Sequence, residues 1–260
     1  MTKCAFSIIF VWLEIKGIYL KNRIVIYRNL LKQEFEDLAS RIIYEDNHLL
    51  IINKKVGEIV QGDKTGDEPL VDTFKAFIAQ RDSKPGHVFI GLAHRLDRPV
   101  SGLVVLAKTS KALTRLNEMF RGQDVEKYYW ALVGMEPVPA SGELNDHLYK
   151  VERLNKSFAC RPGELRKDAK LAKLKYRTIG MTERYYMLEI QLLTGKHHQI
   201  RCQLANIGSP IKGDLKYGAP RSNPDGGISL HARRLSFVHP VRKETLVIEA
   251  PVPDNWPLII

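Results

Sequence analysis

The chain has 260 residues, with 40 Lys and Arg against 29 Asp and Glu, for a formal net charge of +11. Its 44% hydrophobic and 27% charged residues are ordinary for a globular protein with a sizeable core and exclude a low-complexity chain. The excess of positive charge is typical of a protein that meets a polyanion such as nucleic acid, although a basic, solvated surface without a partner has the same charge.

Residues 1–39 are expected to form an N-terminal extension ahead of a single domain over residues 40–260. The apolar run Ala5–Leu13 is too short to span a membrane, Glu14 and Lys16 interrupt it, and no small-residue cleavage site follows. We expect a strand or helix packed on the domain, or a poorly ordered segment, with a secretion signal as the less favoured alternative.

The cysteines are widely spaced and form no CxxC pair; they are Cys4, Cys160 and Cys202. An odd number at this spacing argues against a disulfide framework and against a zinc site. The pattern fits a reducing cytoplasm.

Turn signals and apolar periodicity predict short strands and helices in the first half of the chain. Ser40–Lys55 is typical of a strand, a Glu-Asp-Asn turn and a second strand. Helices are predicted over Pro69–Arg81 and Thr109–Arg121, the second with Thr109 as its N-cap. The apolar run Ser101–Lys108 predicts a buried strand, and Lys127–Gly134 predicts another strand.

The segment Lys150–Arg177 carries ten Lys and Arg against three Asp and Glu. Two interpretations stay open for it: a solvated loop or hairpin, and a mobile basic arm that holds a phosphate backbone.

The last part of the chain predicts more strands than helices. Tyr185–Leu193 is typical of a strand, and Thr194–Gly208 of a helix whose apolar residues recur at helical spacing. Two closing strands are expected within residues 228–240 and 244–251. Because strands outnumber helices and do not alternate regularly with them, we predict an α+β fold with a mostly antiparallel sheet.

Several common site motifs are missing. No GxGxxG, GxxxxGK[ST] or GxSxG pattern occurs, so the sequence indicates no dinucleotide site, P-loop or nucleophile elbow. The run KHHQIR has no acidic partner, and we expect His197 and His198 on different faces of a helix, which argues against a metal there.

Asp97 lies between Arg95 and Arg98, directly ahead of the strand expected to be buried. A neighbouring guanidinium favours the ionised form of a carboxyl group, and an ionised carboxylate can act as nucleophile or base. Pro99 disfavours helical backbone at Arg98, so a turn is expected. Taken alone, the motif favours a structural Arg–Asp pair that fixes this turn.

Six separated segments change that interpretation. They are IINKKVGEIVQGD, AHRLDRPVSGLVVLAK, KYYWALV with its Lys-x-Tyr-x-Ala pattern, LLTGKHHQIRCQL, GSPIKGDLKYG and LHARRLSFVHP. In this order they resemble the motifs of RNA pseudouridine synthases of the RluA type, from about Ser40 to Pro251. The resemblance implies a catalytic domain over residues 40–260, with a mixed, mostly antiparallel sheet flanked by helices and loops around a central cleft.

The chain departs from the family pattern at three positions. Val100 stands where the family usually has Thr, Lys55 where it has Pro, and Lys196 where Arg is commoner. None of these removes a catalytic group, so they bear on substrate choice. Residues 1–39 are also too short and too apolar for an S4-type RNA-binding domain.

The resemblance implies an isomerase that detaches the base of a uridine, rotates it and rejoins it through C5. Asp97 would be the essential carboxylate, and Arg201 would pair with it and keep it ionised. Tyr129 would stack on the flipped base and is also a candidate to take the C5 proton. Base flipping costs about a few kcal/mol, and Arg95 would fill the space that the base leaves. His94 is expected to fix the turn.

Further basic residues are candidates for RNA contacts, together with His197, which would lie beside Arg201 on the helix: Arg98, Lys127, Lys196, Arg233 and Arg234. The implied partner is structured ribosomal or transfer RNA. The resemblance implies no metal and no cofactor, and we expect a cytoplasmic monomer with no membrane contact and no obligatory protein partner.

Two alternatives stay open. The chain can be an RNA-binding or RNA-folding module in which catalysis is secondary or absent, as its charge and the Lys150–Arg177 segment would allow. It can also be another aspartate-dependent enzyme acting on bases, such as a nucleosidase, which would release free base.

Overall fold

Eleven strands join into one sheet within residues 27–84, 86–164 and 166–257, the ranges that this computed structural model describes. The strand order is β1-β2-β4-β10-β5-β9-β8-β6-β7, with β3 on β4 and β11 on β10. The strands are β1 Ile42–Glu45, β2 Leu49–Lys54, β3 Gly91–Leu92, β4 Ser101–Ala107, β5 Glu126–Val133, β6 Ser141–Val151, β7 Lys156–Ala159, β8 Lys170–Met181, β9 Tyr186–Leu192, β10 Leu230–Val238 and β11 Thr245–Glu249. The apolar run Ala5–Leu13 lies outside the described residues.

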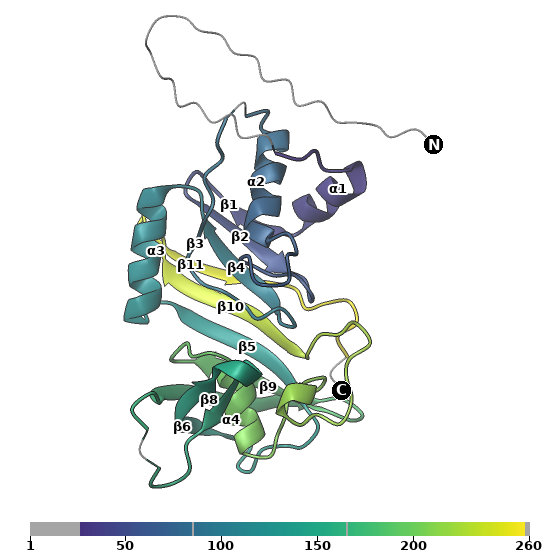
Figure 1. Ribbon diagram of the computed structural model, residues 1–260, viewed down its shortest axis with the longest axis vertical. Helices are drawn as coiled ribbons and strands as arrows, with labels where there is room; N and C mark the ends of the chain where they lie inside the picture. Colours follow the sequence, from purple (N-terminus) through teal and green to yellow (C-terminus); the bar gives the residue numbers. More distant parts are fainter. Residues whose placement is uncertain (1–26, 85, 165, 258–260) are drawn as a thin grey trace, which may run out of the picture.

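The sheet is mixed and almost entirely antiparallel, as predicted. Its one parallel pairing in the described residues joins β10 to β4, where His231 is opposite Ser101 and Ala232 is opposite Gly102. The α+β prediction is therefore confirmed. Strand β5 crosses the middle of the molecule, between the part with α1 to α3 and the part with α4 and β6 to β9 (Figure 1).

Helices cover both faces of the sheet. They are α1 Lys32–Ser40, α2 Leu70–Arg81, α3 Ser110–Gly122 and α4 Gln199–Asn206, with single 3-10 turns at Glu152–Leu154 and Leu215–Tyr217. Buried residues of α1, α2 and α4 share one apolar cluster with Leu50, Ile52 and Tyr129, whereas α3 packs on the opposite face with Leu49 and Ile51. Because successive side chains of β2 point to opposite faces of the sheet, this strand contributes to the apolar clusters on both faces.

Local signals in the first half of the chain predicted its elements well. Helix α2 begins one residue after the predicted start, and Thr109 accepts a hydrogen bond from the Ala112 N–H as the N-cap of α3. Every residue of β4 is buried. Helix α1 was not predicted, and its Leu38, like Leu30 before it, lies in the core.

The prediction of a helix from Thr194 was wrong at its start. Helix α4 begins at Gln199, and residues 194–198 form a turn in which His198 has a left-handed backbone, with φ of 50°. The Gln199 side chain fixes this turn, because its Oε1 accepts from Thr194 Oγ1 at 2.8 Å and from the Lys196 N–H at 3.0 Å.

Much of the basic segment Lys150–Arg177 is strand. It contains the end of β6, all of β7 and most of β8, and both β7 and β8 pair with β6. Its backbone therefore matches the hairpin alternative. Across the described ranges, no helix has the length and apolar character needed to cross a membrane.

Gly102 allows the parallel contact between β4 and β10. Its φ is +113°, and an added Cβ would lie 2.4 Å from the Ala232 carbonyl oxygen and 2.5 Å from its nitrogen.

Gly102→Ala should lower the free energy of unfolding by more than about 2 kcal/mol, since both backbone strain and a backbone clash oppose the substitution. Urea unfolding measures this. Gly134→Ala, where an added Cβ meets nothing within 4 Å, is the control; equal effects of the two variants would contradict the argument.

Candidate active site

A cleft of about 960 Å³ brings together residues from three distant parts of the chain. Asp97 comes from the loop before β4, Tyr129 from β5 and Arg201 from α4, and all three line it. Arg95, which is exposed, also lines this cleft, as do Lys196 and His197. The expected convergence on one cleft is present.

Buried polar contacts hold the loop that carries Asp97. The Lys54 ammonium, 1% exposed, donates to the carbonyls of Arg98 at 3.1 Å and Val100 at 2.7 Å, and burial lowers the pKa of Lys54 to about 8. His94 accepts from the Val105 N–H at 3.0 Å. The residues on both sides of Asp97 are thereby fastened to the sheet.

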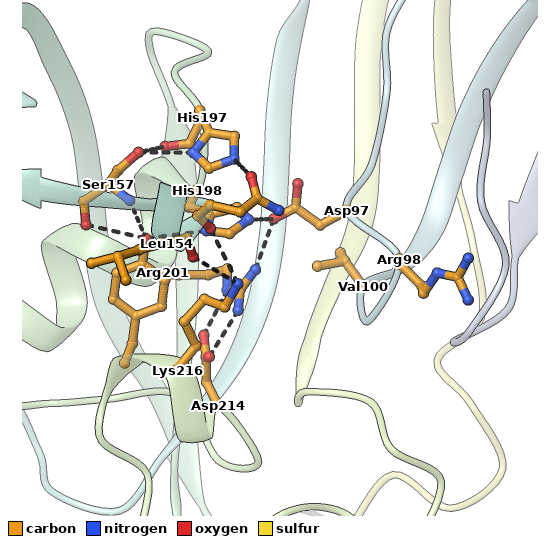
Figure 2. A network of polar contacts seen from close by, with 12 residues as sticks. Asp97, Arg98, Val100, Leu154, Ser157, His197, His198, Arg201, Asp214 and Lys216 are labelled. Carbon is orange, nitrogen blue, oxygen red and sulfur yellow. Dashed lines mark hydrogen bonds and ion pairs between the residues drawn. The ribbon is translucent and has the colours of Figure 1, made fainter. Parts of the chain in front are cut away.

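Arg201 has two carboxylate partners. Its Nε and Nη2 donate to Asp214 at 2.6 and 2.8 Å, and its Nη1 donates to Asp97 Oδ2 at 3.1 Å (Figure 2). Asp214 is 1% exposed, whereas the Asp97 side chain is 33% exposed. Arg201 therefore links a buried counterion to the carboxylate that faces the cleft.

His197 and His198 stack instead of facing apart, which corrects the prediction. Their ring centroids are 3.8 Å apart, because His198 precedes the helix and has a left-handed backbone. His198 Nε2 lies 3.4 Å from Asp97 Oδ2, and its Nδ1 lies 3.1 Å from the Tyr217 hydroxyl. His197 reaches Ser157 Oγ at 2.9 Å, so the pair is held on both sides (Figure 2).

Tyr129 and Lys127 present two kinds of group to the cleft. Burial, and then the charge of Asp97, raises the pKa of Tyr129 well above its usual value, so the phenol keeps its proton at neutral pH. Burial lowers the pKa of Lys127, which is 8% exposed. Within the described ranges the Lys127 ammonium has no hydrogen bond or ion pair, and it is available to a polar substrate atom.

Three predicted residues have other partners. Arg98 lines the cleft but donates to Asp67 and to Thr65 Oγ1, and it points away from Asp97 (Figure 2). Arg233 and Arg234 do not line the cleft. They lie on β10 and stack over rings of β5, Arg233 over Trp130 at 4.6 Å and Arg234 over Tyr128 at 4.1 Å.

The sequence analysis assigned no role to two residues that contact Arg201, Asp214 and Tyr217. Asp214 and Tyr217 lie in GDLKYG, a segment matched to the family without a role for either residue. The signal available was an acid and an aromatic in a turn-rich run that also holds two glycines. Among the described residues, no group of three or more His, Cys, Asp or Glu side chains is placed to hold a metal ion.

Comparisons with known proteins find relatives in sequence and in fold. The sequence model for RNA pseudouridylate synthase matches residues 48–206. Ribosomal large subunit pseudouridine synthase C of Vibrio vulnificus is 33% identical over 230 residues, covering 86% of this chain and 69% of that protein. The tRNA pseudouridine synthase C of the same species is 33% identical over 234 residues, covering 83% and 91%. The solved structure of human RNA pseudouridylate synthase domain containing 4 has a TM-score of 0.71 at 25% identity, covering 85% of this chain and 91% of that one.

Buried neutral histidines should make stability fall in acid. Burial lowers the pKa of His94 to about 3 and that of His231 to about 4, so below the ordinary value of 6.5 the unfolded chain binds protons that the folded chain does not. This stability is fully present above pH 6.5. It should fall toward pH 4.5, by up to about 1.4 kcal/mol per pH unit for each histidine. Urea unfolding at several pH values measures the slope.

The control separates these histidines from other titrating groups. His94→Gln should make the slope shallower, whereas the exposed His147, changed to Gln, should leave it unaltered. An unchanged slope in His94→Gln would contradict the neutral, buried state of this ring.

Proposed function

The chain belongs to the RNA pseudouridylate synthase family, and we propose that it isomerises uridine to pseudouridine in structured ribosomal or transfer RNA with Asp97 as the catalytic carboxylate. The observation that carries the proposal is the meeting of Asp97, Tyr129 and Arg201 in one cleft. In the reaction the bond from C1′ to N1 breaks, a bond from C1′ to C5 forms, C5 loses a proton and N1 gains one. All atoms are retained.

Asp97 is the group best suited to act on the flipped nucleotide. It pairs with Arg201 at 3.1 Å, is partly exposed to the cleft and lies in a loop that buried contacts hold on both sides. Asp97 could add to the sugar, add to the base or assist elimination. Each route needs a negatively charged carboxylate that is oriented toward the flipped nucleotide. A carboxylate so held requires little reorganisation when the base arrives.

Tyr129 is suited to stack on the base while its hydroxyl stays neutral. A phenol whose pKa is raised by burial is a poor base at neutral pH, so Asp97 is the better candidate to take the C5 proton. Arg95 is exposed at the cleft and has a planar group that can replace the stacking lost by the flipped base. Lys127, Lys196 and His197 would meet the phosphates or the uracil edge.

We further propose that residues 40–260 form the catalytic domain, with residues 1–39 as an extension, and that the protein acts as a monomer in the cytoplasm. One chain supplies every residue of the cleft described above. Cys160 and Cys202 are free thiols in the described part of the chain, which fits a reducing compartment.

Tritium release tests the reaction. RNA carrying tritium at C5 of uridine should release it to water with the wild-type protein, and Asp97→Asn should lower the rate by at least about a thousandfold because it removes the charge and keeps the shape. Mapping of pseudouridines in cells with and without the protein would then identify the RNA.

The same assay separates the alternatives. Intact pseudouridine in the product would support the proposal, whereas free uracil would identify a nucleosidase. If the wild type releases no tritium from total cellular RNA while it binds RNA, the binding-module alternative is favoured.

The basic segment Lys150–Arg177 should contribute to RNA affinity by contacting phosphates of the RNA backbone. Four exposed residues there have no ion pair in the described residues: Arg153, Arg161, Lys167 and Lys170. If each contacts a phosphate, changing all four to Gln should reduce the slope of log binding constant against log salt by roughly 3–4 units. Filter binding at several salt concentrations measures the slope.

A matched control carries the same change of charge elsewhere. Its four residues are exposed, lie away from the cleft and have no ion pair in the part of the chain described: Lys111, Arg184, Arg221 and Lys243. If the two quadruple variants have equal salt slopes of RNA binding, the basic segment Lys150–Arg177 is solvated and does not contact phosphate.

A further inference from the structure

We propose that His198 is a positioning residue: with Arg201 it anchors Oδ2 of Asp97, which leaves Oδ1 as the oxygen that reacts with the nucleotide. The inference rests on the proposed function, because it assumes that Asp97 acts on RNA. It adds a residue with a defined tautomer and a choice between the two oxygens of Asp97.

Both neighbours of Asp97 approach the same oxygen. Arg201 Nη1 lies 3.1 Å from Oδ2, and His198 Nε2 lies 3.4 Å from the same atom (Figure 2). Within the described ranges, no hydrogen bond or ion pair is made at Oδ1. The side chains of His198 and Arg201 are each 6% exposed, against 33% for Asp97. The carboxylate is therefore fastened on its buried side and open on the side of the cleft.

The surroundings of His198 determine which nitrogen carries its proton. The Tyr217 oxygen accepts from the Ser157 N–H at 2.9 Å, and its one proton has two acceptors in reach, the Ser157 carbonyl at 3.2 Å and His198 Nδ1 at 3.1 Å. The neighbour of His198 Nε2 is the carboxylate of Asp97, which can only accept, so we assign the proton to Nε2 and the acceptor role to Nδ1. A neutral imidazole that accepts at Nδ1 carries its proton on Nε2. Burial, and then the charge of Arg201, lowers the pKa of His198 to about 2, so the ring is neutral at pH 7. The Nε2–H is then the donor that lies nearest to Asp97 Oδ2, at 3.4 Å between the heavy atoms.

The backbone also indicates a functional constraint at this position. His198 has φ of 50°, a left-handed conformation that strains the backbone of a non-glycine residue and that is concentrated at functional sites. The stacked ring of His197 holds it there, and His197 is itself held by Ser157 Oγ at 2.9 Å and Asn155 Oδ1 at 3.1 Å. The strain is thus opposed by contacts that face the imidazole toward Asp97.

Kinetics of variants test the positioning role on RNA that the wild type modifies. His198→Leu should lower kcat by at least about tenfold with KM changed less than about twofold, because the carboxylate loses a donor but the RNA keeps its contacts. His198→Gln, whose amide can donate from a similar distance, should recover part of the loss.

Tyr217→Phe tests the tautomer through activity. It removes the hydroxyl that fixes Nδ1 as an acceptor, so kcat should fall in the same direction as for His198→Leu. The double variant should be no worse than His198→Leu alone, because both changes interrupt one chain of contacts. His147→Gln, an exposed histidine outside the cleft, is the control and should match the wild type.

Nitrogen-15 NMR of the histidine rings gives a readout that does not need activity. The wild-type His198 should be the neutral Nε2–H tautomer from pH 5 to 8, and Tyr217→Phe should mix its tautomers. An imidazolium or an Nδ1–H ring in the wild type overturns the inference. So does an unchanged kcat in a folded His198→Leu or, where that variant does not fold, a His198→Gln or Tyr217→Phe indistinguishable from the wild type. A wild type inactive on RNA that still has the Nε2–H ring would refute the proposed function and leave the tautomer assignment standing.

Discussion

The ion pair between Arg201 and Asp214 is the interaction on which the site depends. A guanidinium that is 6% exposed must have a counterion, and Asp214 provides one through two hydrogen bonds in the interior. Asp214 takes two of the five N–H donors of Arg201, and one further donor, on Nη1, reaches Asp97. Asp97 is therefore held by a cation whose charge is already largely balanced. It can stay ionised and still be available to a substrate.

The fold brings these groups together from distant parts of the chain. Asp97 and Arg201 are 104 residues apart, and Arg201 reaches the cleft because β5 and β9 pair and place α4 beside it. On the other side, Lys54 of β2 fastens the loop of Asp97 to the sheet, and Gly102 lets β4 approach β10. Contacts in the interior thus hold both sides of the site. Such preorganisation suits a reaction whose transition state carries developing charge.

Local sequence signals correctly predicted the elements whose position depends on interactions between residues close in the chain. The buried strand β4, the N-cap at Thr109 and the start of α2 follow from apolar runs, a hydroxyl and a proline. The start of α4 was misplaced because the spacing of Ile200 and Leu204 says where a helix has its apolar face but not where it begins. The helix starts at Gln199 because the Gln199 side chain binds the preceding turn and His198 has a left-handed backbone. Neither feature can be recognised from a single sequence.

The partners of Asp97 are tertiary, so local signals could suggest the carboxylate but not its surroundings, and Arg201 was predicted as its partner only through the family resemblance. Arg95 and Arg98 are the nearest arginines along the chain, yet neither pairs with Asp97: Arg98 turns to the loop of Asp67, and Arg95 is exposed at the cleft. The burial of Asp214 likewise follows from packing that no short motif encodes.

A neutral His198 completes the electrostatic argument. A second full cation at Oδ2 would stabilise the carboxylate of Asp97 further and make it a weaker nucleophile and base. A neutral N–H donor orients the same oxygen at much smaller cost in reactivity. Burial, and then the charge of Arg201, lowers the pKa of His198 and keeps the ring neutral, so the arginine that binds Asp97 also favours the neutral form of its other neighbour. One buried cation thereby acts on the carboxylate and on the imidazole together.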